Sequence, residues 1–206
     1  MTQDLGYFEH VRSDIAPLLP SSAKRILEIG CGAGATLAWL KTRYPSSETV
    51  GVEGNLALKE RLATNADTSL IADLHEGLPD LGNFDLILAL DVLEHLTNGE
   101  AVLRRLREML AEGGRMIISL PNVAHWSVAV PLLLFGRFDY ADAGIMDRTH
   151  LRFFTEKTAR EMIASAGLRT DRSLVVLHGA KSKFINLMTC GLVKRRLGKQ
   201  VVLSAS

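Results

Sequence analysis

The sequence is poor in the residues and runs that mark secreted or membrane-spanning proteins. Its 206 residues include only two cysteines and six prolines, so no disulfide framework is expected. The longest apolar runs, residues 128–135 and 184–193, are too short to cross a bilayer. The first residues lack the basic and apolar segments of a signal peptide. We therefore expect a soluble, cytoplasmic protein.

An excess of charge of one sign is also lacking. The chain has 24 basic and 23 acidic residues and a net charge of +1, which gives no electrostatic case for a nucleic-acid partner. Neither the cysteines nor the six histidines show the spacing of metal ligands, so no metal is expected. The 47% hydrophobic and 23% charged residues are typical of a globular domain.

Strands and helices alternate along the first part of the chain. We expect strands at residues 25–29, 49–52, 69–72, 84–89 and 115–119, and helices at residues 35–43, 56–63 and 100–110. Apolar strands that alternate with helices predict a parallel sheet covered on both faces. The sequence shows no domain boundary, so one domain over residues 1–206 is expected.

The regular pattern breaks after Pro121. Residues 121–155 are expected to form an insert that faces the substrate, because long loops in compact domains are usually functional. The elements expected after the insert are a helix at residues 156–166 capped by Thr155, an apolar and basic helix at residues 184–196, and strands at residues 174–178 and 200–203.

The most informative stretch is the glycine turn, Gly30-Cys31-Gly32-Ala33-Gly34. An apolar strand leads into it and a helical pattern follows, which is the arrangement where a nucleotide-like ligand approaches the backbone. Side chains in place of these glycines would block the ligand or forbid the turn. A dinucleotide-dependent dehydrogenase would favour a third glycine where this sequence has Ala35, which makes that alternative the weaker one.

Acidic residues mark the carboxyl ends of four expected strands. These are Glu28, Glu53, Asp73 and Asp91, the last of which opens the motif Asp91-Val92-Leu93-Glu94-His95. Ligands of open parallel sheets bind beyond these strand ends. Glu53 is placed to accept hydrogen bonds from both hydroxyls of a ribose, and Asp73 to accept one from an adenine amino group.

In this order and spacing the motifs resemble class I S-adenosylmethionine-dependent methyltransferases related to the ubiquinone-biosynthesis enzymes. The resemblance covers residues 12–167 and implies a Rossmann-like, doubly wound α/β fold with seven mostly parallel strands, the last antiparallel. It implies S-adenosylmethionine as the cofactor, with Glu28 holding the methionine amino group directly or through water. Tyr7 and Phe8 would either form a lid over the site or pack a helix onto the sheet. The cofactor contacts that it implies are Glu28, Gly30, Cys31, Gly32, Glu53, Asp73, Leu74, Leu90 and Asp91.

Three histidines are candidates for the chemistry of the acceptor. Methyl transfer depends largely on holding acceptor and sulfonium close and aligned, and a general base is needed only for an acceptor such as a hydroxyl. The candidate bases are His150, His95 and His125, in that order, and a structural role is the alternative for each.

Two further residues have both a chemical and a structural interpretation. Asn122 could present an amide to a substrate or only shape its turn. Cys31 at a helix start could be a nucleophile, but a small side chain beneath the ligand is the favoured explanation.

Residues 121–167 are also similar to a bacterial subgroup whose members accompany, or are fused to, glycosyltransferases of cell-surface polysaccharide pathways. The resemblance implies methyl transfer to an oxygen, in preference to nitrogen or carbon, of a small-molecule, saccharide or lipid-linked acceptor. The same segment is similar to a protein that accompanies homoserine acyltransferases in methionine biosynthesis, so a cofactor-binding but catalytically silent partner is the alternative. Those relatives lack the motif at Asp91–His95.

Two apolar segments bear on possible partners. Residues 128–135, and the helix 184–196 with Lys194, Arg195 and Arg196 at its end, could meet a membrane surface or a lipid-like acceptor. We expect instead that both segments pack on the core, with the basic residues at a helix C-terminus. A homodimer contact is a third alternative.

Overall fold

The structure is a computed structural model that describes residues 10–206 apart from residues 178 and 192. Within these residues, seven strands form one sheet in the order β3-β2-β1-β4-β5-β7-β6. They are β1 (Arg25–Ile29), β2 (Glu48–Glu53), β3 (Thr68–Ile71), β4 (Phe84–Leu90), β5 (Leu110–Pro121), β6 (Thr170–Val176) and β7 (Gln200–Ala205). The first five strands pair in parallel, and β7 runs antiparallel to both β5 and β6. This confirms the mostly parallel sheet with an antiparallel last strand.

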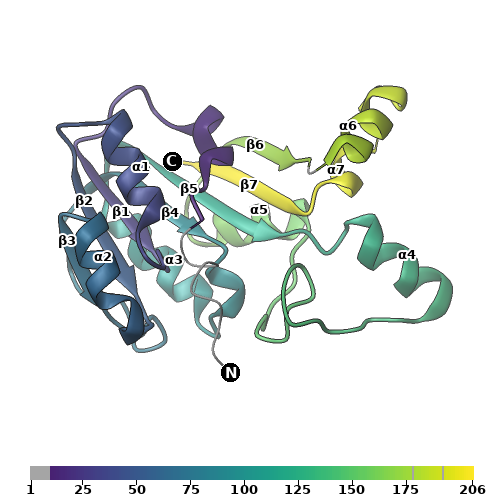
Figure 1. Cartoon of the computed structure of the whole chain (residues 1–206), viewed down its shortest axis with the longest axis horizontal. Helices are drawn as coiled ribbons and strands as arrows, with labels where there is room; N and C mark the ends of the chain where they lie inside the picture. Colours follow the sequence, from purple (N-terminus) through teal and green to yellow (C-terminus); the bar gives the residue numbers. More distant parts are fainter. Residues whose placement is uncertain (1–9, 178, 192) are drawn as a thin grey trace.

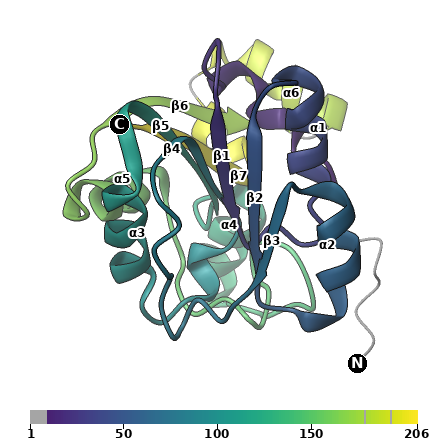
Figure 2. The ribbon, with the colours of Figure 1, turned by 90° about the vertical axis from the view of Figure 1, so that its left-hand side faces the viewer.

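Helices cover both faces of this sheet. They are α1 (Ala35–Arg43), α2 (Lys59–Asn65), α3 (Gly99–Glu108), α4 (Trp126–Phe135), α5 (Glu156–Ser165), α6 (Gly179–Met188) and α7 (Lys194–Leu197), with short 3-10 turns η2 (Ser13–Leu18), η3 (Leu56–Leu58) and η4 (Leu93–His95). Figure 2 shows α1 and α2 against one face and α3 and α5 against the other. The fold is therefore doubly wound, as predicted.

The strands are buried on both faces because their side chains alternate between two cores. In β4, Leu86 and Leu88 belong to the core beneath α1 and α2, whereas Ile87 and Ala89 belong to the core beneath α3 and α5. All four side chains are fully buried. Each large apolar side chain buried in this way stabilises the fold by about 1.5–3 kcal/mol. The result is a rigid sheet whose carboxyl edge carries the loops of interest.

The start of α5 follows the sequence closely. Thr155 is its N-cap, and its hydroxyl accepts a hydrogen bond from the backbone N–H of Thr158. The hydroxyl of Thr158 in turn accepts one from the N–H of Thr155. This reciprocal capping box satisfies two N–H groups that the helix itself cannot pair, and it confirms the predicted cap.

The expected helix at residues 184–196 is wrong in its bounds, since it is divided into α6 and α7. Cys190 and Gly191 have φ values of +49° and +81° between them. A left-handed backbone ends a helix, and Gly191 adopts it without a steric cost. The strand β6 begins at Thr170 and not at the expected residue 174. Its first four residues are polar and partly or fully exposed, so the sequence shows no apolar signal there.

The insert contains a helix, α4, that does not pack on the core. Leu133 is 82% exposed and Phe135 is 70% exposed. In Figure 1, α4 projects from the end of β5, beyond the body of the sheet, and α6 lies at the same end of the molecule. In α6, Leu187 is likewise 74% exposed. The expectation that both apolar segments pack on the core is therefore wrong.

The composition of α4 explains why periodicity did not reveal it. Its sequence, Trp126–Phe135, is apolar on every side, so it shows no alternation of apolar and polar faces. None of the helices in the described ranges has both the length and the apolar character needed to span a bilayer.

Candidate functional site

The glycine turn joins the end of β1 to the start of α1. Gly30, Gly32 and Gly34 have φ values of +61°, +56° and +79°, a region that residues with a Cβ atom rarely adopt. At Gly30 a Cβ atom would also lie 2.7 Å from Cγ2 of Val92. The turn is therefore packed directly against the segment that follows β4, and glycine is required there for two separate reasons.

Glu53, at the end of β2, is held against this turn. Its Oε2 accepts a hydrogen bond of 2.8 Å from the N–H of Gly32, and its Oε1 accepts one of 2.8 Å from the N–H of Asn55. Each carboxylate oxygen can accept more than one hydrogen bond. The side chain is thus fixed in orientation and can still accept bonds from a ligand.

Glu28 is a buried carboxyl group beside the same turn. Glu28 is only 4% exposed, and its Oε2 has no hydrogen-bond partner among the described residues. Burial raises the pKa of Glu28 to about 8, although the charge of Arg12 opposes this shift. Because a buried charge needs a partner, a cationic group of a ligand is the natural complement of this site.

Asp91 lies at the centre of a polar network at the end of β4. Its Oδ2 accepts bonds of 2.6 Å from Arg12 Nη1 and 2.6 Å from Gln200 Nε2, and its Oδ1 accepts one of 2.7 Å from the hydroxyl of Ser119. The backbone of Asp91 has a φ of +54°, which is uncommon for a residue with a side chain. The network ties β4, β5 and β7 to the segment before η2.

Asp73 and Leu74 follow β3 on the same edge. Oδ1 of Asp73 accepts hydrogen bonds from the backbone N–H of His75 at 2.8 Å and lies 2.9 Å from Nδ1 of its ring. These bonds hold the pKa of Asp73 below its usual range. The side chains of Leu74 and Leu90 are buried, one in each of the two cores.

Cys31 is not placed for nucleophilic chemistry. The residue is 8% exposed, and burial together with the charges of Glu28 and Glu53 raises the pKa of its thiol. A thiol that is kept protonated is a poor nucleophile. The position of Cys31 fits the favoured interpretation of a small side chain in the turn.

A second cluster, which we call the Glu94 cluster, consists of Glu94, His95 and His150. Glu94 is fully buried, and Nε2 of His150 lies 4.0 Å from its Oε1. The rings of His95 and His150 meet edge to face with their centroids 4.8 Å apart. The structure thus brings His95, at the end of β4, together with His150 from the insert.

The titration of this cluster reflects its burial. Burial raises the pKa of Glu94 well above its ordinary value, and the charges of Asp91 and Asp147 add to this effect. Burial also lowers the pKa of His95, as does the neighbouring ring of His150. Both shifts favour the uncharged forms, as expected for groups removed from water.

The other two polar candidates of the insert have local structural contacts. Asn122 donates to the carbonyl oxygens of Arg195 and Gly198 at 2.8 and 2.9 Å, so its amide holds the segment before β7 rather than presenting itself to a substrate. His125 is the N-cap of α4, and its Nδ1 accepts a hydrogen bond from the N–H of Ser127. Tyr7 and Phe8, the predicted lid, lie outside the described residues.

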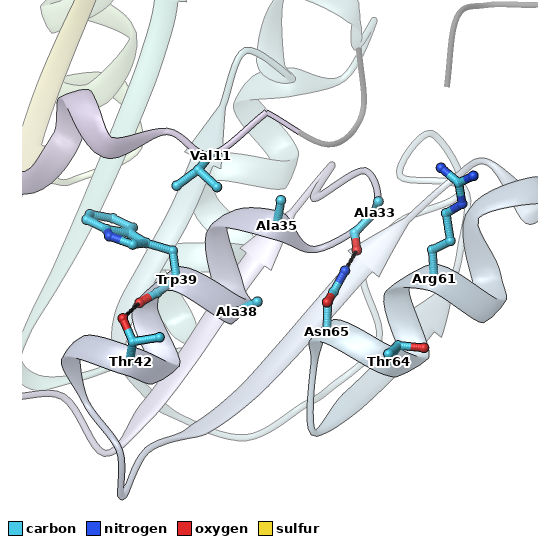
Figure 3. A pocket seen from close by; sticks show the side chains of 9 residues that line it. All are labelled: Val11, Ala33, Ala35, Ala38, Trp39, Thr42, Arg61, Thr64 and Asn65. Atoms are coloured by element: carbon cyan, nitrogen blue, oxygen red, sulfur yellow. Dashed lines mark hydrogen bonds between the residues drawn. The ribbon is translucent and has the colours of Figure 1, made fainter. Parts of the chain in front are cut away.

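A groove of about 730 Å³ lies between α1 and α2, on the outer side of the glycine turn. Figure 3 shows Asn65 donating its amide hydrogen to the carbonyl oxygen of Ala33 at 2.8 Å, with Trp39 and Val11 on the other side of the groove. The lining is mainly alanine, threonine and other uncharged side chains. Since Glu28, Glu53 and Asp91 do not line it, this groove is separate from the carboxylates of the sheet edge.

Comparison with known proteins identifies the family. A family profile described as a methyltransferase domain matches residues 5–173. The chain belongs to this methyltransferase family. S-adenosylmethionine is the cofactor that the family and the fold imply.

The similar proteins agree with this assignment. A ubiquinone biosynthesis O-methyltransferase of Azorhizobium caulinodans is 34% identical over 132 residues, which cover 60% of this chain and 51% of that protein. One of the same name from Chelativorans sp. is 29% identical, with 81% of this chain and 68% of that protein covered. A structure of a SAM-dependent methyltransferase from Archaeoglobus fulgidus superposes with a TM-score of 0.68 at 17% identity, covering 98% and 94% of the two chains. The chain spans about half the length of the first of these relatives.

Arg12 and Glu94 are site residues that the sequence interpretation missed. Arg12 stands alone before the first strand, and no spacing connects it with Asp91. Glu94 lies inside the motif Asp91–His95, and the apolar residues Leu93 and Leu96 close to it are a sequence signal that it is buried.

Proposed function

We propose that the chain transfers the methyl group of S-adenosylmethionine to an oxygen of a small-molecule, saccharide or lipid-linked acceptor. The observation that carries this proposal is Glu28, a buried carboxyl group whose Oε2 has no partner among the described residues, beside a turn in which three glycines have left-handed backbone. The names of the O-methyltransferase relatives support oxygen as the acceptor atom. None of the relatives reported above supports a catalytically silent partner.

The residues at the glycine turn fit the cofactor group by group. Glu28 would hold the ammonium of the methionine part, because this supplies the charge partner that its burial demands. Arg12 lies close enough to lower the pKa of Glu28, so the site also contains a cation suited to a carboxylate. Glu53 would take the ribose hydroxyls, and Asp73 would accept from the adenine amino group. The bound cofactor supplies an electrophilic methyl group on a sulfonium.

The acceptor side is assigned to His95 and His150. In an oxygen transfer the new bond would form between the acceptor oxygen and the methyl carbon, the bond from carbon to sulfur would break, and the hydroxyl proton would pass to an unprotonated ring nitrogen of His150 or His95. An acceptor activated beside these rings would lie near the end of β4, next to Asp91. His125 is the weaker candidate, because one nitrogen of its ring caps α4.

The test is a transfer assay with methyl-labelled S-adenosylmethionine and a panel of phenolic, saccharide and lipid-linked saccharide acceptors. We expect label on an oxygen of one class, located by mass spectrometry, and formation of S-adenosylhomocysteine in equal amount. His150→Ala should lower turnover about 100-fold without weakening the binding of S-adenosylhomocysteine, and His10→Ala, at an exposed histidine elsewhere, should have no effect. Label on nitrogen or carbon, or no transfer by a chain that binds the cofactor, would contradict the proposal.

A further inference from the structure

The Glu94 cluster brings three possible metal ligands to one point. Glu94 and His95 lie in η4, directly after β4, and His150 comes from the insert. One possible ligand atom from each side chain lies within 4.8 Å of the other two. Three possible ligand atoms at this separation could surround a small cation. Because they come from two separate segments of the chain, the spacing of residues in the sequence does not reveal them.

Glu94 lacks the partners that a buried carboxylate needs. The residue has no exposed surface, and neither of its side-chain oxygens has a hydrogen-bond partner within the described part of the chain. The backbone carbonyl of Glu94, by contrast, accepts hydrogen bonds from the N–H groups of Leu151 and Arg152. Buried carboxylates are normally paired or bound to a metal, so the carboxylate of Glu94 points to a ligand.

The hydrogen bonds of the two histidines leave a lone pair on each ring. Nδ1 of His150 lies 3.0 Å from the carbonyl oxygen of Ile145, and because a carbonyl only accepts, Nδ1 carries the hydrogen. Nδ1 of His95 lies 3.1 Å from the hydroxyl of Thr149, whose own hydrogen is donated to Asp147 at 2.6 Å. In the neutral rings, both Nε2 atoms are therefore unprotonated.

This pattern is the one found around metal-binding histidines. Such a ring donates its other N–H to a carbonyl, carboxylate or similar group, which fixes its tautomer and orientation. In His150 the arrangement also places the Nε2 lone pair 4.0 Å from Oε1 of Glu94. Nε2 of His150 and Oε1 of Glu94 thus face each other across a gap that a small cation could bridge.

We propose that Glu94, His95 and His150 bind one divalent transition-metal cation of the zinc class. Two imidazole nitrogens and one carboxylate oxygen suit zinc and its neighbours in the first transition row, whereas magnesium and calcium prefer oxygen ligands. Bond lengths of about 2.0–2.2 Å require only a small approach of His150 to Glu94. Three protein ligands also leave a coordination position open, as in catalytic zinc sites.

This inference deepens the proposed function and rests on it for its role in the reaction. A hydroxyl oxygen of the acceptor that takes the open position would have its pKa lowered by the cation, and it would lie beside Asp91 at the end of β4. His95 and His150 would then act as ligands that position the acceptor and not as general bases, and the proton of the acceptor hydroxyl would pass to water. The expectation from sequence that no metal is bound is replaced by this proposal.

The experiment is a calorimetric titration of the chelator-treated full chain with Zn²⁺, together with a visible absorption spectrum after addition of Co²⁺. We expect one Zn²⁺ per chain, an affinity at least 100-fold lower in Glu94→Gln and at least tenfold lower in His150→Asn, and cobalt absorption bands that Glu94→Gln abolishes. His10→Asn removes an exposed histidine outside the cluster and should change the affinity less than twofold. Thermal unfolding of each variant verifies that it is folded, and Glu94→Gln keeps the side-chain shape.

The outcomes separate this inference from the proposed function. A folded wild-type chain that binds no Zn²⁺, or binding that Glu94→Gln and His150→Asn both leave unchanged, would overturn the metal site. Titration of the same samples with S-adenosylhomocysteine reports on the cofactor site independently. Zinc binding without S-adenosylhomocysteine binding would retain the metal site and remove the proposed function, and the reverse result would remove the metal site alone.

Discussion

The two sides of the site differ in how completely their charged groups are paired. On the cofactor side, every carboxylate oxygen of Glu53 and Asp91 accepts a hydrogen bond from the protein itself, and the exception is Glu28, whose Oε2 has no partner among the described residues. On the acceptor side, neither oxygen of Glu94 does so within the described residues. A paired carboxylate is a fixed part of the scaffold, whereas a buried and unpaired one is completed by a ligand. Glu53 and Asp91 are therefore preformed, whereas Glu28 and the Glu94 cluster are completed by their ligands.

Packing also differs between the cofactor side and the acceptor side. The glycine turn is wedged between buried strands, and its neighbours Leu37 and Leu88 are fully buried. The insert contains α4, where Leu133 and Phe135 remain largely exposed. Core contacts thus specify the geometry of the cofactor side, while the insert has surface that is still open to a partner or an acceptor.

The largest effect is expected where turn geometry and packing coincide, at Gly30. Gly30→Ala combines left-handed backbone strain of about 1–2 kcal/mol with an overlap against Val92 that costs about 1–3 kcal/mol, and we expect S-adenosylhomocysteine binding to be lost. Gly136→Ala is the matched control, since Gly136 has a φ of +63° but no atom within 4 Å of the added Cβ. Calorimetry and urea unfolding measure both quantities. Equal effects in the two variants would show that the contact with Val92 is unimportant.

Breaking the paired network should give the next largest effect. Arg12→Met leaves Asp91, whose side chain is 23% exposed, without its cation, and we expect the free energy of unfolding to fall by about 2–3 kcal/mol. Arg137→Met breaks an ion pair in which both side chains are more than 60% exposed and should cost less than about 0.5 kcal/mol. Urea unfolding compares them. A small effect in Arg12→Met would mean that the network is not what fixes Asp91.

The buried carboxyl group of Glu28 predicts a pH dependence. Its pKa is raised to about 8 in the folded chain from about 4.3 in the unfolded chain. The folded state therefore holds a proton that the unfolded state loses, and the stability contributed by Glu28 is complete below pH 4 and is lost as pH rises toward 8. We expect Glu28 to contribute a slope of about 1.4 kcal/mol per pH unit in this window, measured by urea unfolding, and Glu28→Gln to remove this contribution while that of Glu94 remains.

The same titration links Glu28 to the cofactor. An ammonium group bound beside Glu28 favours the carboxylate, so S-adenosylhomocysteine should release a proton when it binds at pH 7. Calorimetry in buffers with different ionisation enthalpies detects this proton. A stability slope that Glu28→Gln leaves unaltered, with no proton released on binding, would place the ammonium elsewhere.

The smallest effect is expected on the open surface of the insert. Leu133→Ala should change the free energy of unfolding by less than about 0.5 kcal/mol, because the side chain is 82% exposed. Leu103→Ala makes the same chemical change in a fully buried side chain of α3 and should cost about 2–5 kcal/mol. If both variants lose similar stability, α4 belongs to the core in solution.

The cofactor side could be predicted from sequence because its signals are local. The glycine turn, the acidic ends of β2 and β3, and the strand at Phe84–Leu90 each lie within one short segment, and parallel strands bring their carboxyl ends together. Local signals likewise predicted the parallel sheet and the cap at Thr155, whereas the number of seven strands came from the family resemblance.

The acceptor side could not be predicted in this way. The Glu94 cluster depends on His150 returning across the sheet edge to meet Glu94, and the network of Asp91 depends on Arg12 and Gln200, which lie near opposite ends of the chain. Such contacts arise from tertiary packing and leave no periodic signal. The helix α4 was missed for a different reason. A segment that is apolar on all sides shows no contrast between an apolar and a polar face.

The central claim is tested most directly by calorimetric titration of the purified chain with S-adenosylhomocysteine, beside Glu53→Ala and Glu48→Ala. Glu53 and Glu48 lie at opposite ends of β2, and only Glu53 contacts the glycine turn. Micromolar binding that falls at least tenfold in Glu53→Ala and is unchanged in Glu48→Ala is the predicted result. A folded wild-type chain that does not bind S-adenosylhomocysteine, or equal binding by the two variants, would contradict a cofactor site at the carboxyl edge of this sheet.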